Sequence, residues 1–187
     1  MKPAILDMIK QVKIVYVSGY FLLEKPQAQF VTEIAKAAQD AGCYIMLDPS
    51  PVISKIDSEV LNTFLSFTSV VFPNLDELYA MTKCDNINCG VKALLKTVPC
   101  IAIKMGADGS RLIARQGFRF AQGCVPEAGF NYSAPAEKVT PVDTTGGGDA
   151  FNGGFIASFL RGESPLRWLI TGNSLATEII SRKAHNA

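Results

Sequence analysis

Histidine is nearly absent from this sequence, and two well-known nucleotide-binding patterns do not occur in it. The one histidine among the 187 residues is His185, near the C-terminal end, so we do not expect catalysis by histidine. The phosphate loop G-x-x-x-x-G-K-S/T is missing, which excludes the nucleotide hydrolases built on it. The dinucleotide fingerprint G-x-G-x-x-G also fails, because its third glycine falls on Phe151 when counting starts at Gly146. This absence argues against a dinucleotide-dependent oxidoreductase, an alternative that a nicotinamide-binding test would address.

The chain also lacks an excess of charge of one sign and a long apolar run. It has 18 Lys and Arg against 17 Asp and Glu, a net charge of +1 with no basic block, so neither nucleic acid nor a membrane is an expected partner. The apolar segment 12–23 contains Lys13, is too short to cross a bilayer and lacks a small-residue cleavage site. We interpret it as a buried strand and its continuation, and we expect a cytoplasmic protein.

Cysteine is present, but not in a pattern that predicts a disulfide framework or a zinc site. The five cysteines are odd in number, and no paired C-x-x-C spacing occurs. We therefore expect reduced thiols, most of them packed in the core. They are Cys43, Cys84, Cys89, Cys100 and Cys124.

What the chain does have is 48% hydrophobic residues, enough for one globular domain with an ample core. Short β-branched and aromatic runs predict strands, and segments with helical periodicity lie between them. Strands are expected at 14–17, 44–47, 70–72 and 100–103, and helices at 26–41, after Asp57, at 74–83 and at 91–97. This alternation predicts right-handed crossovers, a parallel sheet and helices on both faces.

The pattern changes in the second half of the chain. Segments 111–114 and 118–121 flank a turn that contains glycine, which predicts an antiparallel hairpin at the sheet edge. Two helices follow, at 148–160 and 165–181. We find no repeat, low-complexity tract or linker. The predicted fold class is therefore α/β: a single domain over 1–187 with a doubly wound, mostly parallel sheet and an antiparallel edge hairpin.

The most distinctive stretch is 140–155, which reads T-P-V-D-T-T-G-G-G-D-A-F-N-G-G-F. Residues 139–142 can end a strand, a glycine turn follows, and a helix with an apolar stripe begins after it. A glycine turn that opens into a helix directs unpaired backbone N–H groups at one point, where the helix dipole adds positive potential. Asp149 lies beside this anion hole, an arrangement that suits phosphoryl transfer. The alternative is an ordinary helix start with Asp149 in its first turn.

The run D-T-T-G-G-G-D-A-F-N-G-G-F resembles the C-terminal signature of the ribokinase-like (PfkB) family of sugar and nucleoside kinases, which usually reads D-T-x-G-A-G-D. One position departs, Gly147 where Ala is common, and it leaves the backbone donor in place. The resemblance implies an ATP-dependent phosphotransferase that transfers the γ-phosphate to a hydroxyl of a sugar or nucleoside. Asp149 would be the base that takes the hydroxyl proton. The backbone N–H groups of Gly146, Gly147, Gly148 and Asp149 would stabilise the transferring phosphoryl group.

The segment Asn74-Leu75-Asp76-Glu77 resembles the N-x-x-E motif of the same family, which orders Mg²⁺, water and phosphates. Asn74 would then contact the nucleotide, and Glu77 would hold Mg²⁺ through water, as this ion prefers. The same spacing is that of a capping box, worth about 1 kcal/mol of helix stability. Both roles can hold at once, because a helix N-terminus is itself an anion site.

Two further segments match family positions along the nucleotide. The run Lys104-Met105-Gly106-Ala107-Asp108-Gly109 resembles the strand end where glycines allow close approach, which makes Lys104, Gly106 and Gly109 nucleotide-binding candidates. A turn that leads into the hairpin explains this run equally well. Asn173 matches the position that faces the adenine base, and its alternative is a solvent-facing helical residue.

Asp143 and Thr145 match positions that help bind a monovalent cation such as K⁺ beside the anion hole. Asp143 has a simpler alternative role, which is to cap the turn. The remaining ligands in the family are carbonyls after the last helix, often in the sequence T-R-x-G-A. This chain reads S-R-K-A-H-N-A from residue 181 and lacks that glycine.

The resemblance covers essentially the whole chain, but only the C-terminal part of the family pattern. The resemblance implies a further βαβ section, a small β-sheet lid and segments that hold the sugar before the matched part. We find no counterpart of them in these 187 residues and expect a fragment, a truncated gene product or a remainder supplied separately. The substrate therefore stays open among ribose, fructose, other sugars and nucleosides. We expect exposed apolar surface that favours a homo-oligomer, and weak adenine-nucleotide binding without competent sugar-kinase activity by the chain alone. The alternative function is a nucleotide-binding module without catalysis that acts through a partner.

Overall fold

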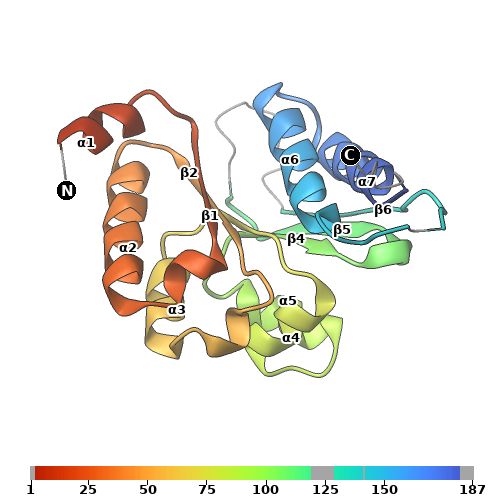
Figure 1. The fold of residues 1–187 in the computed structure, drawn as a ribbon, viewed down its shortest axis with the longest axis horizontal. Coiled ribbons are helices and arrows are strands. Elements are labelled where there is room, and N and C mark those ends of the chain that lie inside the picture. The colour runs from red at the N-terminus through yellow and green to blue at the C-terminus, as the bar shows by residue number, and fades with distance from the viewer. Residues whose placement is uncertain (1–2, 119–128, 141, 182–187) are drawn as a thin grey trace, which may run out of the picture. The chain divides into compact units, whose positions relative to one another are not determined.

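The computed structural model describes residues 3–118, 129–140 and 142–181, and the chain forms two compact units, Met1–Ile101 and Ala102–Ala187 (Figure 1). The boundary between the units lies within strand β4, Cys100–Lys104. That 1–187 form one domain stays a prediction. No helix within the described ranges is both long and apolar enough to cross a membrane.

The first unit is built on parallel strands. Strands β1 (Ile14–Ser18), β2 (Tyr44–Asp48), β3 (Val70–Val71) and β4 pair side by side in that order. Each strand is one of the short apolar runs that predicted it, and residues of β2 and β3 are buried as expected for strands covered on both faces. Ser18 lies opposite Asp48 in the register, so β1 and β2 end at the same level.

The predicted burial of segment 12–23 is wrong in part. Val17 and Leu22 are buried, but Tyr16 is 40% exposed and Tyr20 is 55% exposed. The reason lies in the strand order, which places β1 at one end of the sheet with a single neighbour among the described residues. A strand in that position leaves one edge without backbone partners.

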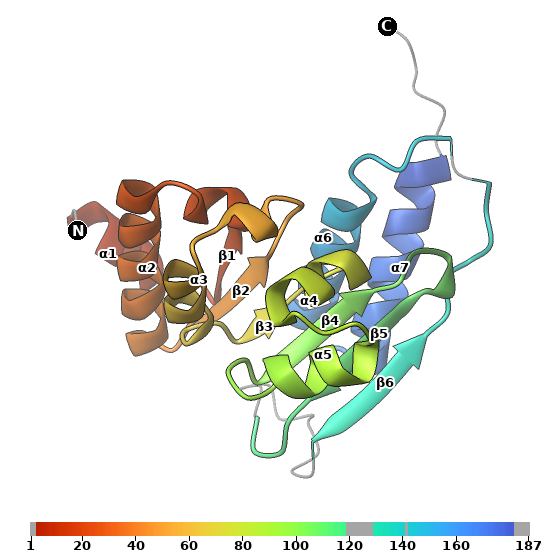
Figure 2. The same cartoon turned by 90° about the horizontal axis from the view of Figure 1, so that it is seen from below.

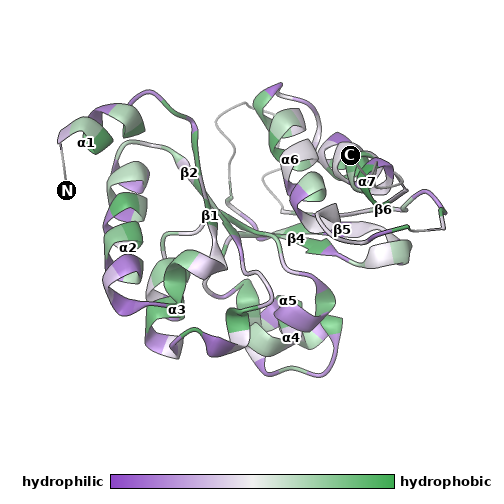
Figure 3. Cartoon of the chain, in the orientation of Figure 1, coloured by the Kyte–Doolittle hydropathy of each residue, from purple (hydrophilic) through white to green (hydrophobic). Residues whose placement is uncertain are grey.

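Three helices accompany β1 and β2: α1 (Pro3–Ile9), α2 (Lys25–Asp40) and α3 (Ser58–Leu65). Helix α2 packs against β2 and α3 (Figure 1). The buried face of α2 is a stripe of small and β-branched residues. Along the helix as a whole, hydrophilic and hydrophobic residues alternate (Figure 3). The predicted cap of α3 is confirmed, because the Asp57 side chain accepts hydrogen bonds from the N–H groups of Glu59 (2.9 Å) and Val60 (3.2 Å).

Helices α4 (Leu75–Thr82) and α5 (Ile87–Leu94) pack against each other. Lys83 ends α4 in the left-handed conformation, with φ 59°, and Asn86 begins α5 by accepting a hydrogen bond from the Cys89 N–H at 2.9 Å. A Cβ atom on Gly90 would lie 2.9 Å from Cγ of the buried Leu78. The missing side chain therefore lets the two helices approach.

The second unit contains the end of β4, strands β5 (Ser110–Ala114) and β6 (Phe130–Ala134), and helices α6 (Gly147–Leu160) and α7 (Pro165–Ser181). Strands β5 and β6 are antiparallel. Helix α7 packs on both strands and along α6 (Figure 2). Together with the parallel strands of the first unit, this pair confirms the predicted α/β class with an antiparallel edge.

The contact between α6 and α7 is aromatic and close. The Trp168 ring lies edge-on to Phe155 and Phe159, with ring centroids 5.5 and 5.1 Å apart. A Cβ atom on Gly154 would lie only 2.8 Å from the Thr171 carbonyl oxygen. Between α6 and α7, hydrogen bonds from the side chains of Arg161, the larger effect, and Ser158 lower the pKa of the Glu163 carboxyl.

The predicted hairpin partner of β5 differs from the observed one. Phe118 is not in a strand, and the rest of the predicted arm, 119–121, lies outside the described residues. Strand β5 pairs instead with β6. The predicted strand end at 139–142 is also wrong, since none of its described residues belongs to a β-strand. The N–H of Val142 donates to the Ile180 carbonyl at 2.9 Å, and residue 141 is a proline with no N–H.

The prediction of reduced thiols is wrong for one pair of cysteines. Cys84 and Cys89 form a disulfide between the end of α4 and the first turn of α5, with Cα atoms 5.7 Å apart. The left-handed turn at Lys83 reverses the chain and brings these two residues together. Cys43 and Cys100 are free and buried, as predicted, and Cys124 lies outside the described residues.

Candidate active site

Helix α6 begins after a turn that requires glycine at residue 146. Gly146 has φ 78° and ψ −5°, a left-handed conformation that costs glycine little. The first helical hydrogen bond joins the Ala150 N–H to the Gly146 carbonyl at 2.9 Å, and the Gly147 N–H donates to the Thr144 carbonyl at 3.2 Å. No side chain in the described part of the chain caps this helix start. The amides of Gly148 and Asp149 therefore face out of the helix end, as in an anion site.

Lys104 and Asp149 flank this helix start. Lys104 ends β4, and its Nζ lies 3.5 Å from the position that a Cβ atom would take on Gly148. Asp149 is exposed in the first turn of α6. An anion at the helix start would meet the lysine charge and the helix dipole, with a carboxylate beside it.

The loop before α6 is held by its own side chains and by α7. The Asp143 carboxylate accepts a hydrogen bond from the Thr145 N–H at 2.8 Å. This bond and a second one from the Thr145 hydroxyl lower the pKa of Asp143, so the carboxylate stays ionised at neutral pH. The turn-capping alternative for Asp143 is thus present. The carbonyl ligands expected from 182–187 lie outside the described residues.

Gly109 and Asn173 converge on the segment 134–136. A Cβ atom on Gly109, whose φ is 87°, would collide with the Ala134 carbonyl oxygen. Asn173 is buried, and its Nδ2 donates to the carbonyls of Ala134 (2.9 Å) and Pro135 (3.1 Å). The solvent-facing alternative for Asn173 is therefore wrong. We missed the part that 134–136 plays, although the alternation of Phe130, Tyr132 and Ala134 was a period-2 signal.

Gly106 lies in the short turn between β4 and β5. Its φ is 59°, and the turn is closed by a hydrogen bond from the Met105 N–H to the Gly109 carbonyl at 2.8 Å. The turn explanation for this run is therefore present in the structure. A turn of this kind also leaves backbone free of side chains at the end of β4, so the nucleotide role stays compatible with it.

In the first unit, Asn74 and Glu77 form a complete capping box. The Asn74 side chain accepts from the Glu77 N–H at 2.8 Å, and the Glu77 carboxylate accepts from the Asn74 N–H at 2.8 Å. Glu77 is 5% exposed, which is unusual for a carboxylate. No group of three or more Asp, Glu, His or Cys side chains that could hold a metal occurs in the described ranges. A single buried carboxylate therefore fits an ion held mainly by water and phosphate.

A second polar cluster of the first unit lies at the ends of β1 and β2. Asp48 is buried and accepts hydrogen bonds from the Tyr16 hydroxyl (3.3 Å) and the Ser50 N–H (3.0 Å). The Ser50 hydroxyl lies 3.0 Å from that of Ser18, and Ser50 has φ 60°, which is rare outside glycine. The sequence predicts this cluster as a site candidate, because ligand sites in such sheets lie beyond the carboxyl ends of the strands and Asp48 to Ser50 follow β2.

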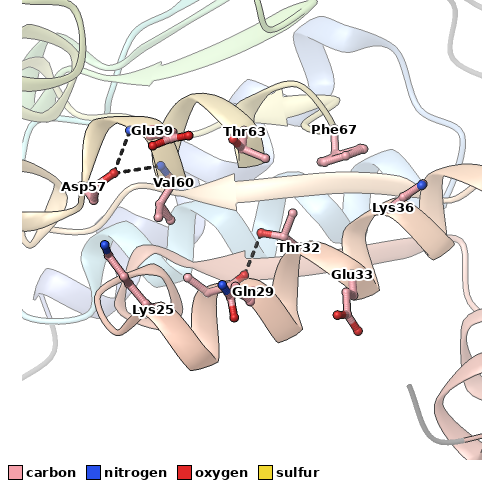
Figure 4. A pocket seen from close by; sticks show the side chains of 11 residues that line it. Lys25, Gln29, Thr32, Glu33, Lys36, Asp57, Glu59, Val60, Thr63 and Phe67 are labelled. Carbon is pink, nitrogen blue, oxygen red and sulfur yellow. Dashed lines mark hydrogen bonds between the residues drawn. The ribbon is translucent and has the colours of Figure 1, made fainter.

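Two surface cavities contain none of the predicted site residues. One of about 510 Å³ lies between α2 and α3 and is lined by residues of both charges, among them Lys25, Glu33, Lys36 and Glu59 (Figure 4). The other, of about 490 Å³, lies between α6 and α7. In the first, the Asp57 carboxylate and the Thr32 hydroxyl are engaged with backbone groups.

The comparisons with known proteins agree with the fold and with the signature. The pfkB family carbohydrate kinase pattern matches residues 1–187. The chain is 27% identical over 166 residues to an aminoimidazole riboside kinase from Salmonella typhimurium, a match covering 85% of this chain and 48% of that protein. It is 25% identical over 195 residues to an adenosine kinase from Schizosaccharomyces pombe, covering 96% of this chain and 53% of that protein.

A solved structure shows the same fold. Arabidopsis thaliana ribokinase complexed with ribose and ATP superposes with a TM-score of 0.75 at 22% identity, covering 98% of this chain and 55% of that one. The chain thus spans about half the length of the relatives it matches. Because the family pattern extends over all 187 residues, the chain belongs to the pfkB family of carbohydrate kinases.

Proposed function

We propose that this chain is the nucleotide-binding and catalytic part of an ATP-dependent kinase that phosphorylates a hydroxyl of a sugar or nucleoside. The observation that carries the proposal is the start of α6, where Gly146 turns the chain, no described side chain caps the amides, and Asp149 lies in the first turn. Lys104 adds a positive charge beside Gly148. An anion site, a cation and an accessible carboxylate are the groups that phosphoryl transfer requires of a protein.

Asp149 is the proposed general base. Its exposed carboxylate accepts the proton of the acceptor hydroxyl as that oxygen attacks the γ-phosphorus. The N–H groups of Gly148 and Asp149, and those of the neighbouring glycines where they are free to donate, stabilise the charge on the phosphoryl oxygens. Losing one such donor typically costs about 10²–10³ in rate.

The nucleotide and its metal are the proposed cofactors. Mg²⁺, when bound, neutralises phosphate charge, and Glu77 would hold it through water. Asn74, Lys104, Gly106 and Gly109 would line the nucleotide, and Asn173 would act through the segment 134–136 that it holds. Asp143 and Thr145 would contribute to a K⁺ site beside α6. The relative that is complexed with ribose and ATP supports this choice of cofactor.

The acceptor class follows from the relatives and stays broad. An aminoimidazole riboside kinase, an adenosine kinase and a ribokinase share a ribose unit among their named substrates. We propose a ribose-type hydroxyl as the first acceptor to test. We further propose a cytoplasmic protein that forms homo-oligomers through the exposed apolar residues near β1, among them Tyr16, Tyr20 and Phe21.

A second candidate function is a nucleotide-binding module that has no catalytic activity and acts through a partner. It rests on the same helix start, because uncapped amides and the Lys104 charge bind a phosphate whether or not an acceptor is oriented beside it. Orienting the reactants can supply about 7–11 kcal/mol of a barrier. A chain that binds ATP but does not orient an acceptor would forfeit much of this rate enhancement.

Transfer of labelled phosphate from γ-labelled Mg·ATP to a panel of sugars and nucleosides tests the two functions. The kinase predicts one labelled acceptor, and its formation should fall by about 10²–10⁴ in Asp149→Asn, the loss typical of a missing general base. Asp40→Asn is the matched control, because Asp40 is equally exposed and lies at the end of α2. ATP binding without transfer to any acceptor would favour the binding module instead.

A further inference from the structure

The disulfide between Cys84 and Cys89 has no role in the proposed function and joins two helices of the first unit. It closes the short loop between α4 and α5, where Asn86 accepts a hydrogen bond from the Cys89 N–H at 2.9 Å. Cys89 lies in the first turn of α5. By the chain-entropy relation, closing so short a loop contributes about 2 kcal/mol, less than closing a long one. A disulfide selected for stability alone would gain more by closing a longer loop.

Accessibility separates this pair from the other described cysteines. Cys89 is exposed and Cys84 is half-buried, whereas Cys43 and Cys100 are buried. Burial raises the pKa of both Cys43 and Cys100, which keeps these thiols protonated and poorly reactive. A dissolved thiol or disulfide can therefore reach one pair of sulfur atoms in the described part of the chain.

The pair is also linked to the helix that carries the capping box. Helix α4 begins at Leu75 and is capped by Asn74 and Glu77. It buries Leu78 against Gly90 of α5 and ends two residues before Cys84. The disulfide fixes the end of α4 to α5 and so limits fraying of a helix of eight residues. Breaking it removes the covalent link between the end of α4 and α5, while the Leu78 contact with Gly90 and the packing of α4 on the segment Ile53–Lys55 remain.

We propose that Cys84 and Cys89 form a thiol–disulfide exchange site for low-molecular-weight thiols such as glutathione, and that its redox state sets the stability of α4. This inference goes beyond the proposed kinase function and does not depend on it. Exposed disulfides are among the labile ones that exchange with dissolved thiols.

The exchange proceeds in two balanced steps. The Cys89 thiolate attacks one sulfur of oxidised glutathione, forms a mixed disulfide and releases one glutathione thiolate, which takes up a proton. The Cys84 thiol loses its proton and attacks the Cys89 sulfur, which releases the second glutathione. The two protein thiols together lose two electrons and two protons, and one molecule of glutathione disulfide becomes two thiols.

Equilibration of the 187-residue chain with mixtures of reduced and oxidised glutathione tests the exchange. The samples are quenched with acid and alkylated, and mass spectrometry gives the alkylated fraction of each cysteine. The alkylated fractions of Cys84 and Cys89 should fall together as the mixture becomes more oxidising. Cys43 and Cys100 should stay unmodified when the folded protein is alkylated. In Cys89→Ser, Cys84 has no partner and should carry a glutathione adduct instead of a disulfide.

The effect on α4 is measured on the same samples. Reduction should lower the Tm by roughly 4–8 °C, as expected for a short closed loop in a chain of this size. The Glu77 amide should exchange its hydrogen faster in the reduced form, by at least about threefold. The double variant Cys84→Ser/Cys89→Ser should behave like the reduced protein under both conditions.

Three results would overturn the proposal. Cys84 and Cys89 could remain alkylatable in excess oxidised glutathione, or their disulfide could persist in excess reduced glutathione. Equal hydrogen-exchange rates of the Glu77 amide in both redox states would show that the disulfide does not affect the stability of α4. Kinase activity enters none of these measurements, so a failure of the proposed function leaves this test unaffected.

Discussion

One carboxylate of the first unit, Glu77, has two possible roles. It accepts a hydrogen bond from the Asn74 N–H at 2.8 Å, and the Asn74 side chain accepts one from the Glu77 N–H in return. This reciprocal pair accounts for the helix start without any metal. Carboxylates are also the ligands that Mg²⁺ takes in proteins, directly or through water. Substitution can separate the two roles because glutamine preserves only the first.

We expect Glu77→Gln to leave the free energy of unfolding within about 0.5 kcal/mol of the wild-type value, since Gln also satisfies a capping box. If Glu77 orders Mg²⁺, the Mg²⁺ concentration that gives half-maximal nucleotide binding should rise. Glu77→Ala is the companion variant, and it should lose about 1 kcal/mol of stability as well. Superimposable Mg²⁺ titrations of the wild type and Glu77→Gln would reject the metal role.

Lys104 is the cation of the second unit that lies beside the start of α6. Lys104→Met keeps an unbranched side chain and removes the charge, so the Kd for Mg·ATP should rise about tenfold, the equivalent of 1.4 kcal/mol. Calorimetric titration at two salt concentrations measures the Kd and its dependence on charge. Lys92→Met on the exposed face of α5 is the control. An unchanged Kd in Lys104→Met would place the phosphates elsewhere.

Asn173 allows the base-reading role to be separated from a positioning role. Because its Nδ2 is bonded to the Ala134 and Pro135 carbonyls, Asn173→Ala should lower the free energy of unfolding by about 2 kcal/mol. It should weaken ATP and GTP binding by the same factor, since it acts through the segment 134–136. Ser174→Ala, at the exposed neighbouring position, should change neither value. A selective loss of ATP binding would show that the amide reads the adenine directly.

For single residues, the sequence predicts hydrogen bonds to near neighbours in the chain but not contacts with distant residues. The capping geometry of Asn74 and the turn role of Asp143 followed from local spacing, because their hydrogen bonds span two or three residues. The partners of Asn173 could not be predicted in this way. They lie 38 and 39 residues away in sequence, and the packing of α7 on β6 brings them together.

The start of α6 and the end of α7 form one packed element pair, which explains the departure from the family signature. A Cβ atom on Gly147 would lie 2.8 Å from Cγ2 of Ile180, too close for an alanine without movement. Isoleucine is stiff at this branch point, so the strain is not relieved by a simple rotation. The backbone of Ile180 also accepts a hydrogen bond from the Val142 N–H. Gly147 is therefore matched to Ile180.

Gly147→Ala should destabilise the chain by about 1–2 kcal/mol, because overpacking outweighs the entropy gained from losing a glycine. In an Ile180→Ala background the same substitution should be neutral or stabilising. Thermal unfolding of the two single variants and the double variant gives the coupling energy, for which we expect at least about 0.5 kcal/mol. Additive effects would show that the two side-chain positions do not interact.

Helices and strands are predicted well where their signals are local, and poorly where a nearby segment competes with a distant pairing partner. Helix 165–181 was predicted with its observed bounds, because its periodicity and Pro165 are local signals. Strand β6 was missed because a nearer apolar run, 118–121, offered β5 a hairpin partner across Gly117. The apolar periodicity predicts the start of α5 at Val91, whereas the Asn86 cap begins the helix at Ile87. The disulfide was missed because sequence spacing does not show that Lys83 turns left-handed.

At the scale of the whole molecule, the fold class was predictable and the arrangement of the site was not. Alternating strands and helices established the α/β class, and the family pattern confirms it over 1–187. The predicted site residues divide between the two compact units, with Asn74 and Glu77 in one and Asp149, Lys104 and Asn173 in the other. Local sequence patterns predict the residues of each set, because the described contacts of each set lie inside one unit.

We propose that the start of α6 performs phosphoryl transfer with Asp149 as the base. The most direct measurement compares Mg·ATP affinity and the rate of γ-phosphate transfer, to an acceptor or to water, for the wild-type chain and Asp149→Asn. We predict similar affinity for both proteins and a transfer rate that is lower by about 10²–10⁴ in the variant, because the substitution keeps the size of the side chain and removes the proton acceptor. Equal transfer rates in the two proteins, or no detectable Mg·ATP binding by either, would contradict the account.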